Sequence, residues 1–373
     1  MKGFFKSYVY PIATLSGSII GVGFLSLPYV ALKSGIWTML FYFAFFTILV
    51  TFIHVIFGEI ALKTPDFKRW PGFLEYYFGS WAKKFILIPI ILGSFGVLLA
   101  YLIVGSQFLG AILSPVLGGS SFVYFLVYLL TLSAIVYLKV DKTSKIQLWT
   151  IILLIVSLFV IFAKGFWHIS LANLFAESPS LNIHNLFLPY GAILFALWGT
   201  ALIPETEEMV RGHKSSLKKI IIISTLIPAA IYVLFTVMVL GLTGGNTTES
   251  ALVGIKNTLG DGLSSVILFV GVITTFTAFI AQGLFLKKVF MYDLKINEKM
   301  SWALVCFTPL ILFLIGFNSF IPLISFVGGV LLGIDGILIL LIYKRIGGNK
   351  IIAYPLITIF ILGIIYSLIY FNK

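Results

Sequence analysis

The chain has 373 residues, of which 60% are hydrophobic and only 10% are charged, and its formal net charge is +12. Soluble domains carry about 25% charged residues, so a soluble enzyme, a nucleic-acid-binding protein and a disordered regulator are all excluded. An outer-membrane barrel is excluded too, because its strands of about 10 residues alternate in polarity. The single cysteine, Cys306, excludes a disulfide scaffold and a thiolate metal cluster.

Long apolar runs recur along the whole chain, and short polar links separate them. A membrane-spanning helix needs about 20 apolar residues. Eleven runs are predicted to span the membrane: 9–32, 36–58, 85–114, 121–138, 146–163, 186–205, 220–242, 263–286, 301–317, 319–343 and 351–370. No link is long enough for a separate domain, so residues 1–373 are expected to form one membrane domain. The longest link, 60–84, is half amphipathic and is expected to lie along the membrane surface.

The basic residues divide unevenly between the two sides of the predicted membrane. If the N-terminus is inside, only Lys33, Lys164, Lys256 and Lys373 of the 25 Lys and Arg residues fall outside, which leaves 21 inside (25 minus 4). Positive loops face the cytoplasm in membrane proteins. We therefore expect a multi-pass protein of the cell membrane with a cytoplasmic N-terminus and an external C-terminus. Its partner is the lipid bilayer, and no nucleic-acid partner is expected.

The first and sixth predicted spans carry the same interruption. Gly23 is followed five residues later by Pro28, and Gly199 is followed five residues later by Pro204. The two pairs are 176 positions apart (199 minus 23, 204 minus 28). Glycine and proline both weaken helices. A helix that unwinds within the membrane frees N–H and C=O groups, which need a cavity, an ion or a substrate as partner.

The matched breaks predict two repeats of five spans, 9–165 and 186–343, followed by an additional eleventh span, 351–370. Because five is odd, the second repeat enters the membrane from the opposite face and is inverted relative to the first. Paired breaks in corresponding spans of inverted repeats point to the binding site of a secondary transporter. The alternative is close packing of small residues between helices, but the matched spacing favours a binding site.

These segments carry a resemblance to a known family. The sequence IGVGFLSLP from Ile20 to Pro28, the segment from Trp198 to Glu205 and the eleven-span plan resemble the amino acid/auxin permease branch of the amino acid–polyamine–organocation superfamily, near the aromatic amino acid permeases. The resemblance covers nearly the whole chain. It implies an all-α integral membrane protein of the LeuT type, with a 5+5 inverted repeat and a peripheral eleventh helix. It also implies amino acid uptake driven by a sodium or proton gradient.

The resemblance further implies a backbone platform that holds the carboxylate and amino groups of the substrate. The matching positions are Ser18, Ile19, Gly21, Gly23, Gly199 and Thr200. Phe195 and Trp198 would border the side-chain pocket, and Tyr101 would bring its hydroxyl to the site. Lipid-facing positions for Phe195 and Trp198, and a packed core position for Tyr101, are the alternatives. The pocket has no basic side chain at its centre, so we expect a neutral substrate, large and apolar or aromatic.

The eighth span predicts a sodium site. It reads GVITT from Gly271 to Thr275, which has the spacing of the superfamily's site: one carbonyl, then the adjacent hydroxyls of Thr274 and Thr275. Carbonyls of Gly17 and Ile20 would complete a shell of five oxygen ligands. Proton-coupled relatives can place a lysine of the fifth span there, and that span has no basic residue here. The alternative is that the threonines bond to their own helix. Sodium is favoured narrowly over the proton.

A proton route remains open through three titratable residues, Asp335, Glu205 and His54. Charged groups inside a membrane are costly and mark functional sites. Asp335 lies nine residues before Lys344, which places it about 13 Å from the inner boundary at 1.5 Å per residue. A carboxylate held by neighbouring donors and a neutral packed histidine are the structural alternatives.

No metal-ligand cluster, phosphate loop or catalytic nucleophile is visible in the sequence, so enzymatic activity and cofactors other than the coupling ion are not expected. The main functional alternative is a membrane receptor subunit of the germinant-sensing type, which resembles these permeases and binds an amino acid without transporting it. A channel is disfavoured because no charged ring or repeated carbonyl filter is present. The oligomeric state is not indicated.

Overall fold

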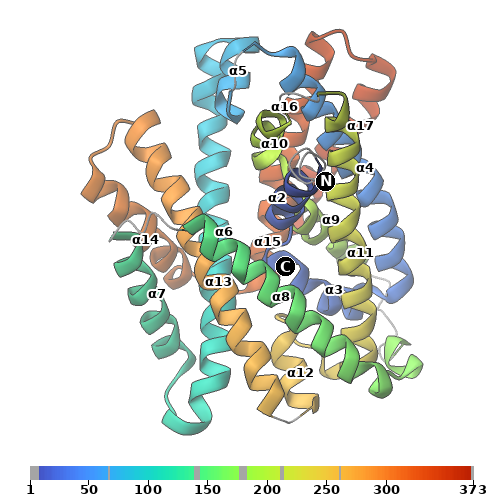
Figure 1. The fold of residues 1–373 in the computed structure, drawn as a ribbon, viewed down its shortest axis with the longest axis vertical. Coiled ribbons are helices and arrows are strands. Elements are labelled where there is room, and N and C mark those ends of the chain that lie inside the picture. The colour runs from blue at the N-terminus through green and yellow to red at the C-terminus, as the bar shows by residue number, and fades with distance from the viewer. Residues whose placement is uncertain are drawn as a thin grey trace.

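The computed structural model describes residues 8–65, 68–137, 143–175, 183–210, 214–259 and 262–370, and within these ranges the protein is a helical bundle without strands (Figure 1). Seven described helices are individually long and apolar enough to cross a membrane, and a bent pair forms an eighth candidate. Each of the eleven predicted spans falls on one helix or on a broken helix. The all-α prediction is confirmed.

The first five spans and their links form the following elements: α2 (Tyr10–Ile19), η2 (Val22–Ser26), α3 (Leu27–Ser34), α4 (Ile36–Lys63), α5 (Trp70–Phe78), α6 (Ser80–Leu117), α7 (Ser121–Tyr137) and α8 (Thr143–Gly165). The remaining chain forms η3 (Phe166–His168), η4 (Leu171–Phe175), α9 (Ile183–Leu197), η5 (Thr200–Leu202), α10 (Ile203–Met209), η6 (Lys214–Ser216), α11 (Leu217–Thr243), η7 (Gly244–Asn246), α12 (Leu252–Leu259), α13 (Gly262–Lys288), η8 (Val289–Asp293), α14 (Glu298–Leu314), α15 (Phe320–Phe326), η9 (Val327–Leu331), α16 (Leu332–Arg345) and α17 (Lys350–Tyr370).

The structure differs from the prediction in the links and in the tenth span. The link 60–84 contains a separate short helix, α5, and α6 already begins at Ser80. The link after α11 contains the helix α12, which was not predicted. The tenth span is interrupted by the π-helical turn η9, between α15 and α16. Such turns have no simple signature in hydropathy, although they occur often at functional sites.

The eleventh helix lies at the periphery of the bundle. Only 17% of the apolar window of α17 is buried inside the protein, compared with 61% for α6 and for the span built on α15 and α16. A membrane helix that is apolar on all sides needs no protein cover where lipid surrounds it. The peripheral position expected for the last span is therefore confirmed.

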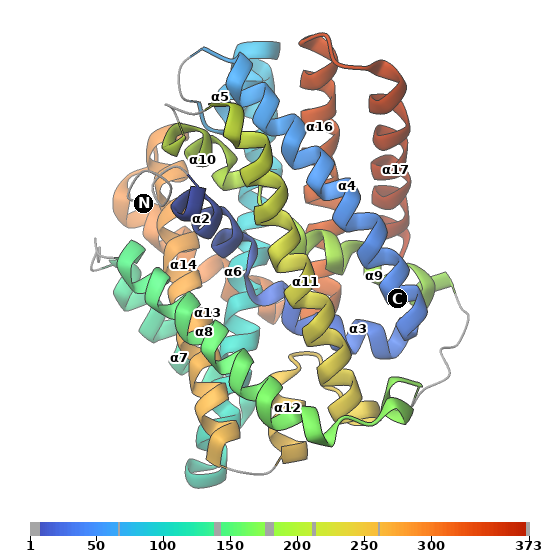
Figure 2. The same ribbon diagram turned by 45° about the vertical axis from the view of Figure 1, so that its right-hand side comes forward.

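The two ends of the bundle carry different links. In Figures 1 and 2, α5 and the turn between α16 and α17 lie at one end, and α12 lies at the other. The first end includes the basic residues Lys68, Lys344 and Arg345, whereas α12 carries Lys256. Which end faces the cytoplasm is a prediction from this charge distribution.

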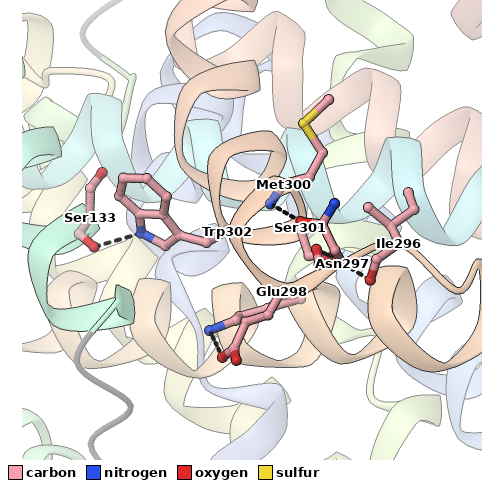
Figure 3. A network of polar contacts seen from close by, with 8 residues as sticks. Ser133, Ile296, Asn297, Glu298, Met300, Ser301 and Trp302 are labelled. Atoms are coloured by element: carbon pink, nitrogen blue, oxygen red, sulfur yellow. Dashed lines mark hydrogen bonds and ion pairs between the residues drawn. The ribbon is translucent and has the colours of Figure 1, made fainter.

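A polar network joins α7, α13 and α14 (Figure 3). The indole N–H of Trp302 donates to the carbonyl of Ser133 at 2.9 Å, and Asn297 caps α14 by accepting the N–H of Met300 at 3.0 Å. Beside it, the buried ammonium of Lys287 pairs with Glu298 at 2.9 Å. These bonds satisfy polar groups where the helices meet and fix the three helices relative to one another.

Candidate functional site

The first span is broken where its glycines predicted. α2 ends at Ile19, Gly21 has an extended backbone (φ −111°, ψ −165°), and the short 3₁₀ turn η2 leads into α3. The two halves are bent by 47°. Pro28 lies in the first turn of α3, where its missing N–H costs no helical hydrogen bond. Glycine therefore interrupts the helix, and proline begins its second half.

The sixth span repeats this construction. α9 ends at Leu197, Gly199 leaves the helical region (φ −136°, ψ 19°), and the 3₁₀ turn η5 leads into α10, with Pro204 in the first turn. The second halves begin at Leu27 and Ile203, which are 176 positions apart (203 minus 27). The predicted pair of matched breaks is confirmed.

The two breaks pack directly against each other through their glycines. A Cβ on Gly23 would lie 2.7 Å from the ring of Phe195 and 3.0 Å from the Cα of Ala196. In the same way, a Cβ on Gly199 would lie 3.0 Å from Cδ1 of Ile19. Distances this short leave no room for a side chain, so each glycine lets its span approach the other at the point of unwinding.

Polar side chains from two neighbouring spans satisfy the freed backbone groups. Nε2 of His54 on α4 accepts the N–H of Gly199 at 3.1 Å, and its Nδ1 lies 3.0 Å from the hydroxyl of Thr225 on α11. The hydroxyl of Tyr232, also on α11, lies 2.8 Å from the carbonyl of Ile19 and 3.3 Å from that of Ala196. Sequence reasoning missed Tyr232, although a lone tyrosine within an apolar span is a signal, because its hydroxyl needs a partner there.

The predicted substrate residues of the first and third spans meet at Gly21. A Cβ on Gly21 would lie 3.6 Å from the hydroxyl of Tyr101, and both residues are only half-buried. Ser18, one turn earlier, is exposed, and its hydroxyl donates to the carbonyl of Leu15 at 2.8 Å. These three residues therefore keep accessible surface at the break.

The predicted residues of the sixth span point in different directions. Phe195 is half-buried and packs on Gly23, whereas the ring of Trp198 lies against His54 and Phe360, with centroid distances of 6.1 and 6.2 Å. The indole N–H of Trp198 is buried without a hydrogen-bond partner among the described residues. Thr200 begins η5 and is buried.

The two threonines of the predicted sodium site have different partners. Thr274 is half-buried and donates to the carbonyl of Val270 at 2.8 Å. Thr275 is fully buried, lies 3.0 Å from the carbonyl of Gly271 and contacts the hydroxyl of Tyr128 on α7 at 2.8 Å. Bonding within the helix leaves the oxygen lone pairs of Thr274 open to a cation. The hydroxyl of Thr275 therefore has a side-chain partner on α7, and either hydroxyl of that pair can be the donor.

The first-span residues assigned to the same cation are Gly17 and Ile20. Gly17 is half-buried and Ile20 is buried directly at the break. The N–H of Ile20 still bonds to the carbonyl of Ser16 at 3.0 Å. The residues that follow Ile20 have left the α-helix, so its carbonyl has lost its regular helical partner. A carbonyl oxygen at this position is suited to bind a cation.

Of the titratable candidates, His54 contacts the sixth-span break directly, Glu205 follows that break in the first turn of α10, and Asp335 lies on α16. Asp335 on α16 accepts the indole N–H of Trp70 on α5 at 3.1 Å. Glu205 on α10 has one carboxylate oxygen that is buried without a hydrogen-bond partner in the described part of the chain. No group of three or more metal-ligating side chains occurs within the described ranges.

The tenth span approaches the sixth at its π-helical turn. A Cβ on Gly328 would lie 2.9 Å from the backbone nitrogen of Phe195, and one on Gly191 would lie 2.8 Å from Cα of Ser325. The backbones of α9 and η9 are therefore in direct contact next to the break. Both glycines are visible in the sequence, but the sequence does not show which helix each of them contacts.

Comparison with known proteins supports this picture. The profile of the tryptophan/tyrosine permease family matches residues 6–365. An amino acid transporter of Arabidopsis thaliana, AVT1H, is 31% identical over 98 residues, which is 26% of this chain and 23% of the plant protein. The match thus spans about a quarter of that relative's length.

Two solved structures are similar to the fold over most of its length. MhsT in complex with L-phenylalanine matches 96% of this chain and 97% of its own, with a TM-score of 0.65 and 14% identity. The inward-facing conformation of Mhp1 matches 96% of this chain and 88% of its own, with a TM-score of 0.68 and 11% identity. These likenesses confirm the predicted LeuT-type fold.

Proposed function

The chain belongs to the tryptophan/tyrosine permease family, and from that premise we propose that it is an amino acid transporter that takes up large neutral amino acids, aromatic ones above all, by cation symport. The observation that carries the proposal is the pair of matched breaks that touch at Gly23 and Gly199. Such breaks bring backbone dipoles to the midplane, where they bind the two charged groups of an amino acid.

Several observations support a neutral substrate with an aromatic side chain. Phe195 lines the break and is half-buried, and the half-buried Tyr101 presents a hydroxyl beside Gly21. Helices that meet there carry lysines near their ends, as Lys63 on α4 and Lys83 on α6 show, which favours a neutral substrate. The family's description names tryptophan and tyrosine, and the similar MhsT structure contains phenylalanine.

We propose sodium as the coupling ion, bound by the carbonyls of Gly17, Ile20 and Gly271 and by the hydroxyl of Thr274. All of these ligands are oxygens, which suit a hard cation. Thr275 is buried against Tyr128, whereas Thr274 is half-buried and bonds to its own helix, so we place Thr274 as the central hydroxyl of the proposed site. The neutral, hydrogen-bonded arrangement of His54 disfavours a proton route through that side chain.

The proposal is tested by uptake into liposomes that contain the purified protein. Radiolabelled tryptophan uptake is measured at fixed pH with sodium or choline outside, and all twenty amino acids compete in turn. We expect sodium-dependent accumulation that aromatic amino acids inhibit most strongly. Preferential uptake of glutamate or lysine would contradict the substrate class. Uptake that does not depend on sodium and is abolished by a protonophore would contradict sodium as the coupling ion. Binding without accumulation would indicate a sensor.

We also propose that the N-terminus faces the cytoplasm and the C-terminus faces the outside. The proposal rests on the 21 of 25 basic residues that fall in inner links and on eleven spans, an odd number. A C-terminal alkaline phosphatase fusion is expected to be active, and a fluorescent-protein fusion at the same place is expected to be dark. The opposite result would exclude this orientation.

A further inference from the structure

We propose that Tyr232 is a positioning residue for substrate binding, because its hydroxyl ties the broken ends of the first and sixth spans to one point on α11. The inference rests on the proposed function, since it assigns the residue that holds the two halves of the binding platform together. Tyr232 belongs to the seventh span and to neither break.

The hydroxyl lies between two carbonyls that have lost their regular helical partners. Ile19 is the last residue of α2, and Ala196 is the last but one of α9. The hydroxyl of Tyr232 is 2.8 Å from the carbonyl of Ile19 and 3.3 Å from that of Ala196, and the side chain is fully buried. The carbonyl of Ile19 also accepts the N–H of Gly21 at 2.8 Å, so the hydroxyl of Tyr232 is its second donor. One hydroxyl carries one proton, so it donates mainly to Ile19 and keeps Ala196 within reach.

The ring of Tyr232 is held by the same span that its hydroxyl reaches. The ring of Phe24 in η2 stacks on the ring of Tyr232, with ring centroids 5.3 Å apart and an angle of 4° between the ring planes. Phe235 packs edge-on against Phe24, with ring centroids 4.8 Å apart. Tyr232 therefore touches the first span on both sides of its break, at Ile19 and at Phe24. Movement of either segment must change one of these contacts.

The same face of α11 holds neighbouring parts of both breaks. The hydroxyl of Ser16 on α2 donates to the carbonyl of Ser224 at 3.2 Å, and Thr225 orients His54, which caps Gly199. α11 is thus a common support for both breaks, and the hydroxyl of Tyr232 reaches carbonyls of both. Removal of that hydroxyl leaves the ring packing intact, and the carbonyl of Ile19 keeps the N–H of Gly21 as a donor. What is lost is the link between the carbonyls of the two breaks, which is expected to weaken the platform more than the fold.

The test compares Tyr232→Phe with Tyr124→Phe in liposome uptake. Tyr124 is a matched control, because it is also buried and its hydroxyl donates to a backbone carbonyl, that of Gly118, in the outer link. We expect Tyr232→Phe to raise KM for tryptophan about tenfold while the maximal rate stays within about twofold, which corresponds to about 1.4 kcal/mol of lost binding energy. Tyr124→Phe is expected to keep the wild-type KM.

A rescue variant separates positioning from a purely structural role. 4-Aminophenylalanine at position 232 keeps an N–H donor on the ring and is expected to restore the wild-type KM, even if Tyr232→Phe does not fold. A wild-type KM for Tyr232→Phe, or a raised KM for the 4-amino variant, would overturn the inference. A lower thermal midpoint with an unchanged KM would do the same. Absence of uptake by the wild-type protein would instead count against the proposed function.

Discussion

The imidazole of His54 is fixed by a hydrogen bond at each nitrogen. Nε2 lies 3.1 Å from the backbone nitrogen of Gly199, and because that N–H can only donate, Nε2 carries no proton. Nδ1 therefore carries the proton and donates it to Thr225 at 3.0 Å, while Thr225 donates to the carbonyl of Ile221 at 3.0 Å. The ring is neutral in this chain of bonds. The imidazole therefore caps the free N–H of Gly199 at the break in the sixth span.

This arrangement predicts opposite outcomes for two variants of His54. Gln offers a side-chain oxygen that can accept the N–H of Gly199, so His54→Gln is expected to keep at least half of wild-type uptake with the same dependence on pH. His54→Ala leaves the N–H buried without a partner, which costs about 1–3 kcal/mol, and uptake is expected to fall at least tenfold. Uptake by both variants is measured from pH 5.5 to 8.5. Loss of the pH dependence in His54→Gln would show that His54 carries the coupling proton.

The two glycines of the first break are expected to respond differently to alanine. A Cβ on Gly21 meets only the hydroxyl of Tyr101, at 3.6 Å, so Gly21→Ala is expected to fold normally but to raise KM, because the methyl group enters the space beside the break. A Cβ on Gly23 meets the backbone of Ala196 at 3.0 Å, so Gly23→Ala must push the two spans apart. We expect a lower thermal midpoint together with loss of uptake.

Both effects are read from uptake kinetics and from thermal unfolding in detergent. An unchanged KM in Gly21→Ala would show that this side of the break does not meet the substrate. A normal thermal midpoint in Gly23→Ala would show that the contact between the spans is looser than the structure indicates.

The spans and breaks could be predicted from the sequence because they depend on local properties. Hydropathy identifies helices that lie in lipid, and the Gly–Pro pairs fix both the unwinding at Gly199 and the restart at Pro204. The hydrogen bonds that hold the breaks could not be predicted in this way. Tyr232 and Thr225 are far from Ile19 and His54 in the chain, and only the packing of α11 against both breaks brings them together.

The same limit applies to the titratable and hydroxyl residues. The sequence indicated Asp335 and Thr275 by type and spacing, but their partners Trp70 and Tyr128 come from a surface helix and from the fourth span. A one-dimensional pattern contains no information on which of two adjacent threonines faces a neighbouring tyrosine. The division between Thr274 and Thr275 therefore required the structure.

The proposed sodium site predicts a specific loss in Thr274→Val. The substitution keeps the shape but removes the hydroxyl oxygen, so the sodium concentration for half-maximal uptake is expected to rise about tenfold. Thr277→Val is the matched control, because Thr277 lies on the same helix and likewise bonds to its own backbone, at 3.1 Å from the carbonyl of Ile273. Uptake is titrated with sodium at constant ionic strength. Equal shifts in both variants would contradict a direct role for Thr274.

If the coupling ion is a proton, Asp335 is the residue expected to carry it. In Asp335→Asn the side-chain oxygen can still accept the indole N–H of Trp70, so the contact between α5 and α16 is expected to persist. If sodium is the coupling ion, this variant keeps sodium-driven uptake and the wild-type dependence on pH. Uptake that becomes independent of an imposed proton gradient in Asp335→Asn would place proton coupling at Asp335 and contradict the sodium proposal.

Glu249, in the link between α11 and α12, has a carboxylate that accepts the N–H groups of Phe320 and Ile321, the first residues of α15. It also lines a cavity of about 460 Å³ between that link, the end of α6 and the start of α7. Burial raises its pKa above the ordinary value of 4.5, although the two N–H groups act in the opposite direction. The folded protein therefore binds the proton more tightly than the unfolded chain does.

The sign of the pH effect follows from this difference. Stability falls as the pH rises from the ordinary pKa through the raised pKa, because only the folded state still holds the proton in that window, and it stays lower above it. Glu249→Gln removes the ionisable group and keeps an oxygen for one N–H. We expect its thermal midpoint at pH 7.5 to equal or exceed that of the wild type, by no more than about 2 °C because solvent screens the partly exposed carboxylate. The difference is expected to vanish near pH 4. A midpoint several degrees below the wild type at pH 7.5 would show instead that the charged carboxylate stabilises the start of α15 by more than its burial costs.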